Sequence, residues 1–117
     1  MTPDRATWAR ALRLVGLGVR GRLVVVGVER VREAAQRGKL QLAVLARDAS
    51  RHSVNKVLPL LAAKGVPLAR DVSAAALGGA VGRDATAVIG IVDAALAKGI
   101  RGIVGSASDV RVRGKIA

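Results

Sequence analysis

Short aliphatic runs alternate along the chain with longer segments in which apolar residues recur every three or four positions. A continuous aliphatic run of about four to eight residues is typical of a buried strand, whereas the longer spacing is typical of a helix with one apolar face. The runs predict strands over residues 23–26, 41–46, 66–70 and 87–92. We expect a helix before, between and after these strands, so helices and strands alternate along the whole chain.

The first helix is expected to begin at Thr2-Pro3-Asp4, because proline is favoured in a first helical turn and a short polar side chain can cap it. Its apolar face would consist of Trp8, Ala11, Leu12 and Val15. Glycine weakens a helix, and we expect the helix to be broken by Gly16, Gly18 and Gly21.

Capping residues also delimit the later helices. Gly27 and Gly38 bound the second one, and Ser50, Ser73 and Asp93 have side chains that can accept a hydrogen bond from the first turn of the next three. The expected ends of those three helices are near Lys64, Gly82 and Gly99.

Alternating strands and helices predict an α/β fold, a three-layer α/β/α sandwich whose four-stranded mixed sheet is covered on both faces. The 117 residues fit one domain, which we place at residues 1–100. Residues 101–117 lack a clear period and carry more basic than acidic residues. We expect this basic tail to be partly mobile, either as a solvated terminus or as an arm that contacts RNA.

The charge balance indicates which class of partner the protein binds. Twenty Lys and Arg oppose eight Asp and Glu, so the net charge is +12. Such a domain attracts polyanions, of which nucleic acid is the usual one; an anionic membrane surface and a plain compositional bias toward arginine are the alternatives. No cysteine is present, which excludes disulfides and thiol catalysis. No run is apolar enough for a membrane span or a secretory signal, and we expect a cytoplasmic protein.

Candidate catalytic patterns are weak. Residues 16–21 match G-x-G-x-x-G, but a dinucleotide site needs a strand before the glycines and a helix after them, and here the order is reversed. His52 is the only histidine, and Ser53 beside it does not by adjacency form a nucleophile–base pair. The acids are scattered singly, as helix caps would be. We therefore expect no enzyme activity, no cofactor and no metal.

Arginine-bearing turns form the stronger pattern. Turns at the same end of a sheet can converge, and the predicted turns carry Arg20, Arg22, Arg47, Arg51 and Arg83. Gly27 would let RNA approach the backbone where the next helix offers its free N–H groups, and Arg30 lies in the first turn of that helix. Without an aromatic platform, recognition would depend on shape, phosphates and base edges. A merely solvated basic surface is the alternative.

Residues 14–100 resemble the ribosomal L-seven-Ae family of kink-turn RNA-binding proteins, especially its bacterial YlxQ-like branch. The resemblance rests on the order of several segments: LVGLGVRGRLVVVG, the turn Arg37-Gly38-Lys39, VLARDAS, LPLLAAKGVP, LGGAVG and AVIGIVDAALAKGI. It implies a three-layer sandwich that binds a sharply bent RNA through one end. By position, it assigns RNA contacts to Gly27, Glu29, Arg30, Asp48 and Arg83.

The chain departs from the family pattern in the second helix. The family has Asn-Glu shortly after the glycine and a lysine three positions further, where this chain has Glu29, Arg30 and Glu33. The loop over residues 83–86 lacks the apolar tip of kink-turn readers. Glu29 and Glu33 are the only glutamates, and helix-stabilising pairs with Arg32 and Arg37 respectively would explain them structurally.

The sequence thus predicts a non-enzymatic RNA-binding protein of the kink-turn type, associated with ribosomal or other structured RNA and possessing RNA-contacting residues Arg20, Arg22, Gly27, Glu29, Arg30, Asp48 and Arg83. A protein-interaction module with only charge-driven RNA binding is the alternative. A nucleotide-binding enzyme built on residues 16–21 is a third hypothesis.

Overall fold

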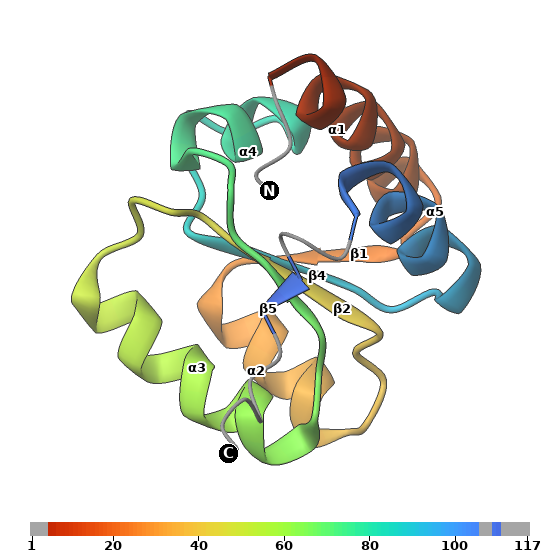
Figure 1. The fold of residues 1–117 in the computed structure, drawn as a ribbon. Helices are drawn as coiled ribbons and strands as arrows, with labels where there is room; N and C mark the ends of the chain where they lie inside the picture. Colours follow the sequence, from red (N-terminus) through yellow and green to blue (C-terminus); the bar gives the residue numbers. More distant parts are fainter. Residues whose placement is uncertain (1–4, 106–108, 111–117) are drawn as a thin grey trace.

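The computed structural model describes residues 5–105 and 109–110, and within them helices and strands alternate in three layers (Figure 1). The helices are α1 (Arg5–Arg20), α2 (Val28–Gln36), α3 (Arg51–Lys64), α4 (Ala74–Ala80) and α5 (Ala94–Val104). The strands are β1 (Val24–Val26), β2 (Leu42–Leu45), β3 (Leu68–Ala69), β4 (Val88–Ile91) and β5 (Asp109–Val110).

The sheet lies between two helical layers, α1, α4 and α5 on one face and α2 and α3 on the other (Figure 1). Each face has its own aliphatic core. Trp8, Leu77 and Ile100 pack on the first face, whereas Val31 and Leu61 pack on the second. Every residue of β2 and β4 is buried, which explains why these strands appear in the sequence as continuous apolar runs. The predicted α/β/α sandwich is confirmed.

The sheet is mixed, with the strand order β1-β4-β2-β3-β5. β2 and β3 run parallel, and β4 is antiparallel to both of its neighbours, pairing Val26 with Ile89 on one side and Leu45 with Val88 on the other. The predicted strands therefore form the contiguous set β1-β4-β2-β3, to which the short β5 adds beyond β3. β1 is left as an edge strand.

Side-chain caps begin the later helices as predicted. Ser50 Oγ accepts a hydrogen bond from Ser53 N at 3.1 Å, and Ser73 Oγ accepts one from Ala76 N at 3.0 Å. Asp93 Oδ2 accepts one from Leu96 N at 2.8 Å. Each bond satisfies a first-turn N–H that the helix itself leaves without a partner.

The first helix ends just before Gly21 as predicted, but it does not break at Gly16 or Gly18, which corrects the prediction for those two residues. α1 continues through Gly16 and Gly18 to Arg20. Gly18 is buried, and a Cβ added there would lie 2.4 Å from Leu96 Cδ2 and 2.9 Å from Val24 Cγ2. The glycine therefore permits close packing of α1 against α5 and β1, and this contact outweighs the poor helix propensity of glycine.

The last helix is longer than predicted. α5 continues past Gly99 to Val104, so it crosses the boundary at residue 100 that was expected to separate the domain from the tail. Residues 106–108 and 111–117 of that tail lie outside the described residues. Among the helices described, none combines the length and the apolar character needed to cross a membrane.

Candidate nucleic-acid interface

Three loops meet at one edge of the sheet. Because β4 runs antiparallel to both β1 and β2, the ends of β1 and β2 lie beside the start of β4. Gly27 N donates a hydrogen bond to Val88 O at 3.0 Å, and Ala46 N donates one to Ala87 O at 2.7 Å. The turns after β1 and β2 and the loop before β4 therefore converge.

Gly27 begins α2 at this edge. Its φ of 99° lies where glycine is favoured, and no side chain caps the helix N-terminus. The partial positive charge of the first-turn N–H groups is therefore left uncompensated by a capping side chain, as in a phosphate-binding helix N-terminus. Arg30 adds a full positive charge within the same turn, next to the negative charge of Glu29.

A cleft of about 540 Å³ runs along the outer edge of β1. All three residues of β1 line it, and Val19 and Val81 add further apolar lining. Its charged lining residues are Arg22, Arg30 and Arg83, which follow α1, begin α2 and follow α4 respectively. The structure thus brings three of the sequence-predicted RNA-binding residues to one hollow.

Arg22 reaches this cleft from a strained turn. Leu23 N donates to Gly18 O at 2.8 Å and Arg22 N donates to Val19 O at 3.1 Å, the bond pair of a Schellman helix end. The left-handed position of that motif usually holds glycine, but here it holds Arg22 with φ 62°. Among the described residues, no other non-glycine residue has a positive φ.

The remaining predicted contacts lie outside the cleft. Arg20 is exposed on the last turn of α1 and does not line the hollow. Asp48 is at the converging edge, but its Oδ1 already accepts a hydrogen bond from Ala74 N at 2.8 Å. This bond ties the loop after β2 to the start of α4, so Asp48 has the structural, cap-like role that the sequence allowed for its scattered acids, with a partner distant in the sequence.

The two glutamates of α2 have different partners. Glu33 forms the expected pair with Arg37, at 3.2 Å between carboxylate and guanidinium. The expected Glu29–Arg32 pair is wrong. Glu29 instead binds Lys56 of α3 at 3.3 Å, and Arg32 donates a hydrogen bond to the Lys56 carbonyl. Packing of α2 beside α3, which sequence alone does not specify, decides this pairing.

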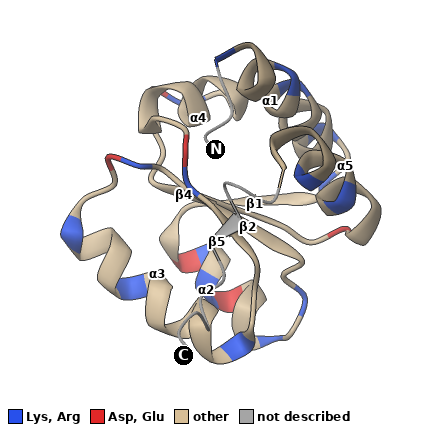
Figure 2. Ribbon diagram, in the orientation of Figure 1, with Lys and Arg blue, Asp and Glu red and all other residues tan. Residues whose placement is uncertain are grey.

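The geometry gives little support to nucleotide binding at residues 16–21, to catalysis by His52 or to metal binding. The glycines of residues 16–21 lie within and at the end of α1 rather than between a strand and a helix. His52 is exposed on the first turn of α3. No cluster of three or more His, Cys, Asp or Glu able to hold a metal occurs in the described part of the chain. Lys and Arg are spread over α1, α2, α3 and α5 (Figure 2).

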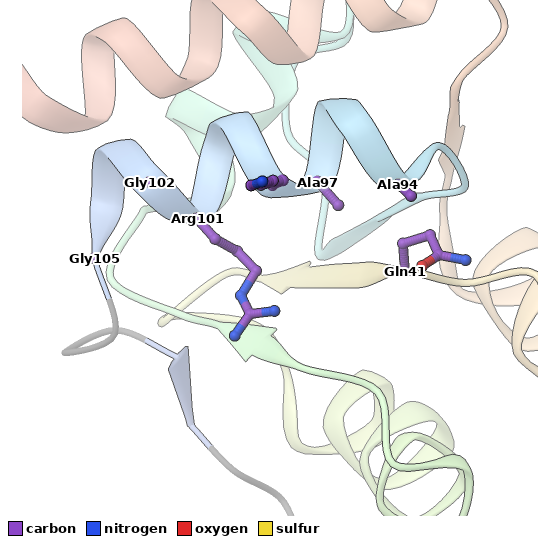
Figure 3. Close-up of a pocket in the computed structure, with 7 residues that line it drawn as sticks. Gln41, Ala94, Ala97, Arg101, Gly102 and Gly105 are labelled. Atoms are coloured by element: carbon purple, nitrogen blue, oxygen red, sulfur yellow. The ribbon is translucent and has the colours of Figure 1, made fainter.

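A second basic cleft, of about 490 Å³, was missed by the sequence reasoning. It lies between α5 and the start of β2, where Arg101 projects from the helix toward the sheet and Gln41 lies at the other end (Figure 3). Lys98 also lines it. The signal was available, since Lys98 and Arg101 are three residues apart on one helix and share a face.

The chain is similar to known proteins over most of its length. The model of the Ribosomal protein L7Ae/L30e/S12e/Gadd45 family matches residues 10–100. A solved structure described as a protein with unknown function from Bacillus halodurans C is 31% identical, with a TM-score of 0.76, covering 82% of this chain and 97% of that one. A Giardia lamblia 15.5kD RNA binding protein is 29% identical, with a TM-score of 0.73 and 90% of both chains covered. No curated protein matches the chain.

Proposed function

The chain belongs to the Ribosomal protein L7Ae/L30e/S12e/Gadd45 family, and from this premise we propose that it is a non-enzymatic cytoplasmic protein that binds bent, kink-turn-like or ribosomal RNA. Family membership and the likeness to an RNA-binding protein support RNA as the partner. Within the family we assign the chain to the bacterial YlxQ-like branch, because Glu29 replaces the asparagine of the kink-turn signature in the manner of that branch.

One observation carries the proposal: Arg30 and Arg83 line one cleft beside the uncapped N-terminus of α2. A phosphate can accept hydrogen bonds from the helix N-terminus while an arginine on each side binds a neighbouring phosphate or a guanine edge. Because the two arginines approach from opposite helical layers, the arrangement suits a backbone that turns sharply between them. Gly27 permits the close approach that this geometry requires.

The other predicted contacts take supporting parts in this proposal. Arg22 extends the positive surface along β1, and Arg20 adds charge at the nearby end of α1. Asp48 acts as a positioning residue, since its bond to Ala74 N holds the loop after β2. Glu29 faces the RNA with its charge balanced by Lys56 and can accept a hydrogen bond from a base amino group.

Binding to a kink-turn RNA and to a plain duplex of equal length tests the proposal. We expect a modest preference for the bent RNA, and we expect Arg30→Ala to reduce that preference. Arg13→Ala is the matched control, because Arg13 is an exposed arginine of α1 outside the cleft. Loss of one phosphate contact should lower the salt slope of log K by about 0.7–0.9, so the slope distinguishes a phosphate contact from a base contact.

Three results would contradict the proposal or its parts. Equal affinity for the bent RNA and the duplex would leave only charge-driven binding, as in the alternative of a protein-interaction module. An equal effect of Arg30→Ala and Arg13→Ala would show that the cleft contributes nothing beyond net charge. Affinity that does not fall steeply between roughly 50 and 200 mM salt would remove phosphate contacts as its source.

A further inference from the structure

The outer edge of β1 presents backbone groups that alternate between donor and acceptor. Val92 N donates to Leu23 O at 2.9 Å and Gly27 N donates to Val88 O at 3.0 Å, which fixes the hydrogen-bonded pairs of the β1–β4 ladder. In such a ladder, the residues between the bonded pairs direct their N–H and C=O groups to the opposite side. The N–H and C=O groups of Val24 and Val26 therefore point away from β4, along the cleft.

This edge is hollowed instead of covered. The cleft is lined by all three β1 residues, by Val19 of α1 and Val81 after α4 from one helical layer, and by Arg30 of α2 from the other. Neighbouring strands lie about 4.8 Å apart, so an extended chain that paired with β1 would lie in this cleft. An exposed sheet edge is itself a template for pairing.

The charges around the cleft favour an acidic occupant. Arg83 follows α4 in one helical layer, and Arg30 belongs to α2 in the other, so an added strand would have one arginine beside each of its faces. Successive side chains of a strand point to opposite faces, which places acidic residues on both faces within reach of these guanidinium groups. Arg22 lies at the far end of the same edge.

We propose that the β1 edge binds an extended acidic peptide segment of a partner protein, which joins the sheet as an additional strand next to β1. The backbone of that segment would exchange hydrogen bonds with Val24 and Val26, and its carboxylates would bind Arg22, Arg30 and Arg83. The inference is independent of the RNA proposal, although the two ligands share Arg30 and Arg83 and should compete.

The donor and acceptor pattern favours a peptide over RNA at this edge. A phosphodiester offers only acceptors, so RNA could meet the two carbonyls only through a 2′-hydroxyl or a base amino group, whereas a peptide backbone satisfies both N–H and C=O groups at the spacing of a strand. A second copy of this chain fits less well. Pairing two β1 edges would bring together the arginines of both copies, each with a net charge of +12.

A labelled hexapeptide, acetyl-Glu-Glu-Val-Val-Glu-Glu-amide, tests the inference by fluorescence anisotropy with the full chain. A second hexapeptide has both valine nitrogens methylated, which removes backbone donors and keeps every charge. We expect methylation, Arg22→Ala and Arg83→Ala each to weaken binding about fivefold or more, and Arg13→Ala to change it less than about twofold. In amide NMR spectra, the peptide should slow hydrogen exchange at Val24 and Val26.

Each alternative to the peptide proposal predicts a different experimental result. Equal binding of the methylated peptide would mean attraction by charge alone and would overturn the inference. Slow exchange at Val24 and Val26 without peptide, together with a dimer in light scattering, would show that a second copy occupies the edge and would also overturn it. If the peptide fails to bind while kink-turn RNA binds, only this inference falls; if the peptide binds and RNA does not, only the RNA proposal falls.

Discussion

Lys56 of α3 donates a hydrogen bond to Glu29 of α2, with Nζ 3.3 Å from Oε2, and thereby joins the two helices beside the edge proposed to bind RNA. The Glu29 side chain is 75% exposed, so the pair contributes little to stability. Its effect is electrostatic, because it balances a carboxylate that would otherwise repel phosphate at the start of α2.

Removal of Lys56 should therefore weaken RNA binding more than it weakens the fold. We expect Lys56→Ala to lower RNA affinity about two- to fivefold and to change the free energy of unfolding by about 0.5 kcal/mol or less. Adding Glu29→Gln to this variant should recover most of the loss. Arg37→Ala is the control, because it frees Glu33 near the other end of α2. Filter binding and urea denaturation check both quantities, and an equal effect of the two single changes would contradict the explanation.

We expect Arg22 to favour RNA binding at a cost to the stability of the fold. Arg22→Gly relieves the left-handed backbone, and we expect the protein to gain about 0.5–1 kcal/mol, a rise in Tm of a few degrees. The same change should weaken RNA binding. Arg22→Ala removes the same side chain but keeps the strain, so it should weaken binding equally without the gain in stability. A Gly variant no more stable than the Ala variant would show that the turn stores no strain.

Two adjacent glycines of α4 should respond oppositely to alanine. A Cβ at Gly78 would lie 2.6 Å from the Cα of Ala85, a backbone atom that cannot move aside cheaply, whereas one at Gly79 meets nothing within 4 Å. We expect Gly78→Ala to destabilise the fold by about 1–3 kcal/mol and Gly79→Ala to stabilise it by about 0.5–1 kcal/mol. Thermal denaturation measures both.

The Gly78 substitution should also affect the edge proposed to bind RNA. Ala85 belongs to the loop that contains Arg83, so its displacement should move that arginine and reduce RNA affinity even at temperatures where the variant is fully folded. Unchanged affinity of folded Gly78→Ala would indicate that the position of the loop does not matter for binding.

Substitutions of Asp48 distinguish a residue that positions the loop after β2 from a residue that contacts RNA directly. Asp48→Ala removes the acceptor for Ala74 N and should cost about 1 kcal/mol, together with some RNA affinity as the loop loosens. Asp48→Asn keeps an oxygen acceptor, removes the negative charge, and should retain most of the stability and all of the RNA affinity. If Asp48→Asn binds RNA as poorly as Asp48→Ala while remaining stable, the carboxylate contacts RNA directly.

The sequence predicted those elements whose signals are local. Ser50, Ser73 and Asp93 cap helices because a side-chain oxygen near a first-turn N–H acts within a few residues, and the aliphatic runs of β2 and β4 reflect burial on both faces. The sequence did not predict features that depend on contacts between segments distant along the chain. Gly18 stays helical because Leu96 and Val24 pack on it.

At the candidate site, too, the sequence revealed the local features but not those that depend on distant segments. Arginine-bearing turns and Gly27 were visible in the sequence, and so was their expected convergence. Which of them share a cleft depends on β1 being the edge strand beside β4, and no local pattern fixes that strand order. For the same reason the binding of Glu29 to Lys56, and the bond from Ala74 N to Asp48, could not be inferred from spacing along the chain.

The bond from Gly27 N to Val88 O has a consequence for how the protein recognises its ligand. It fastens the start of α2 directly to the internal strand β4, which the loop that carries Arg83 enters, so the backbone segments that carry Arg30 and Arg83 are joined through one strand. We expect these two segments to keep their relative position when a ligand binds. For the RNA complex proposed above, we therefore expect the free energy of deformation to fall on the RNA, with a preference for RNAs that already favour the bend.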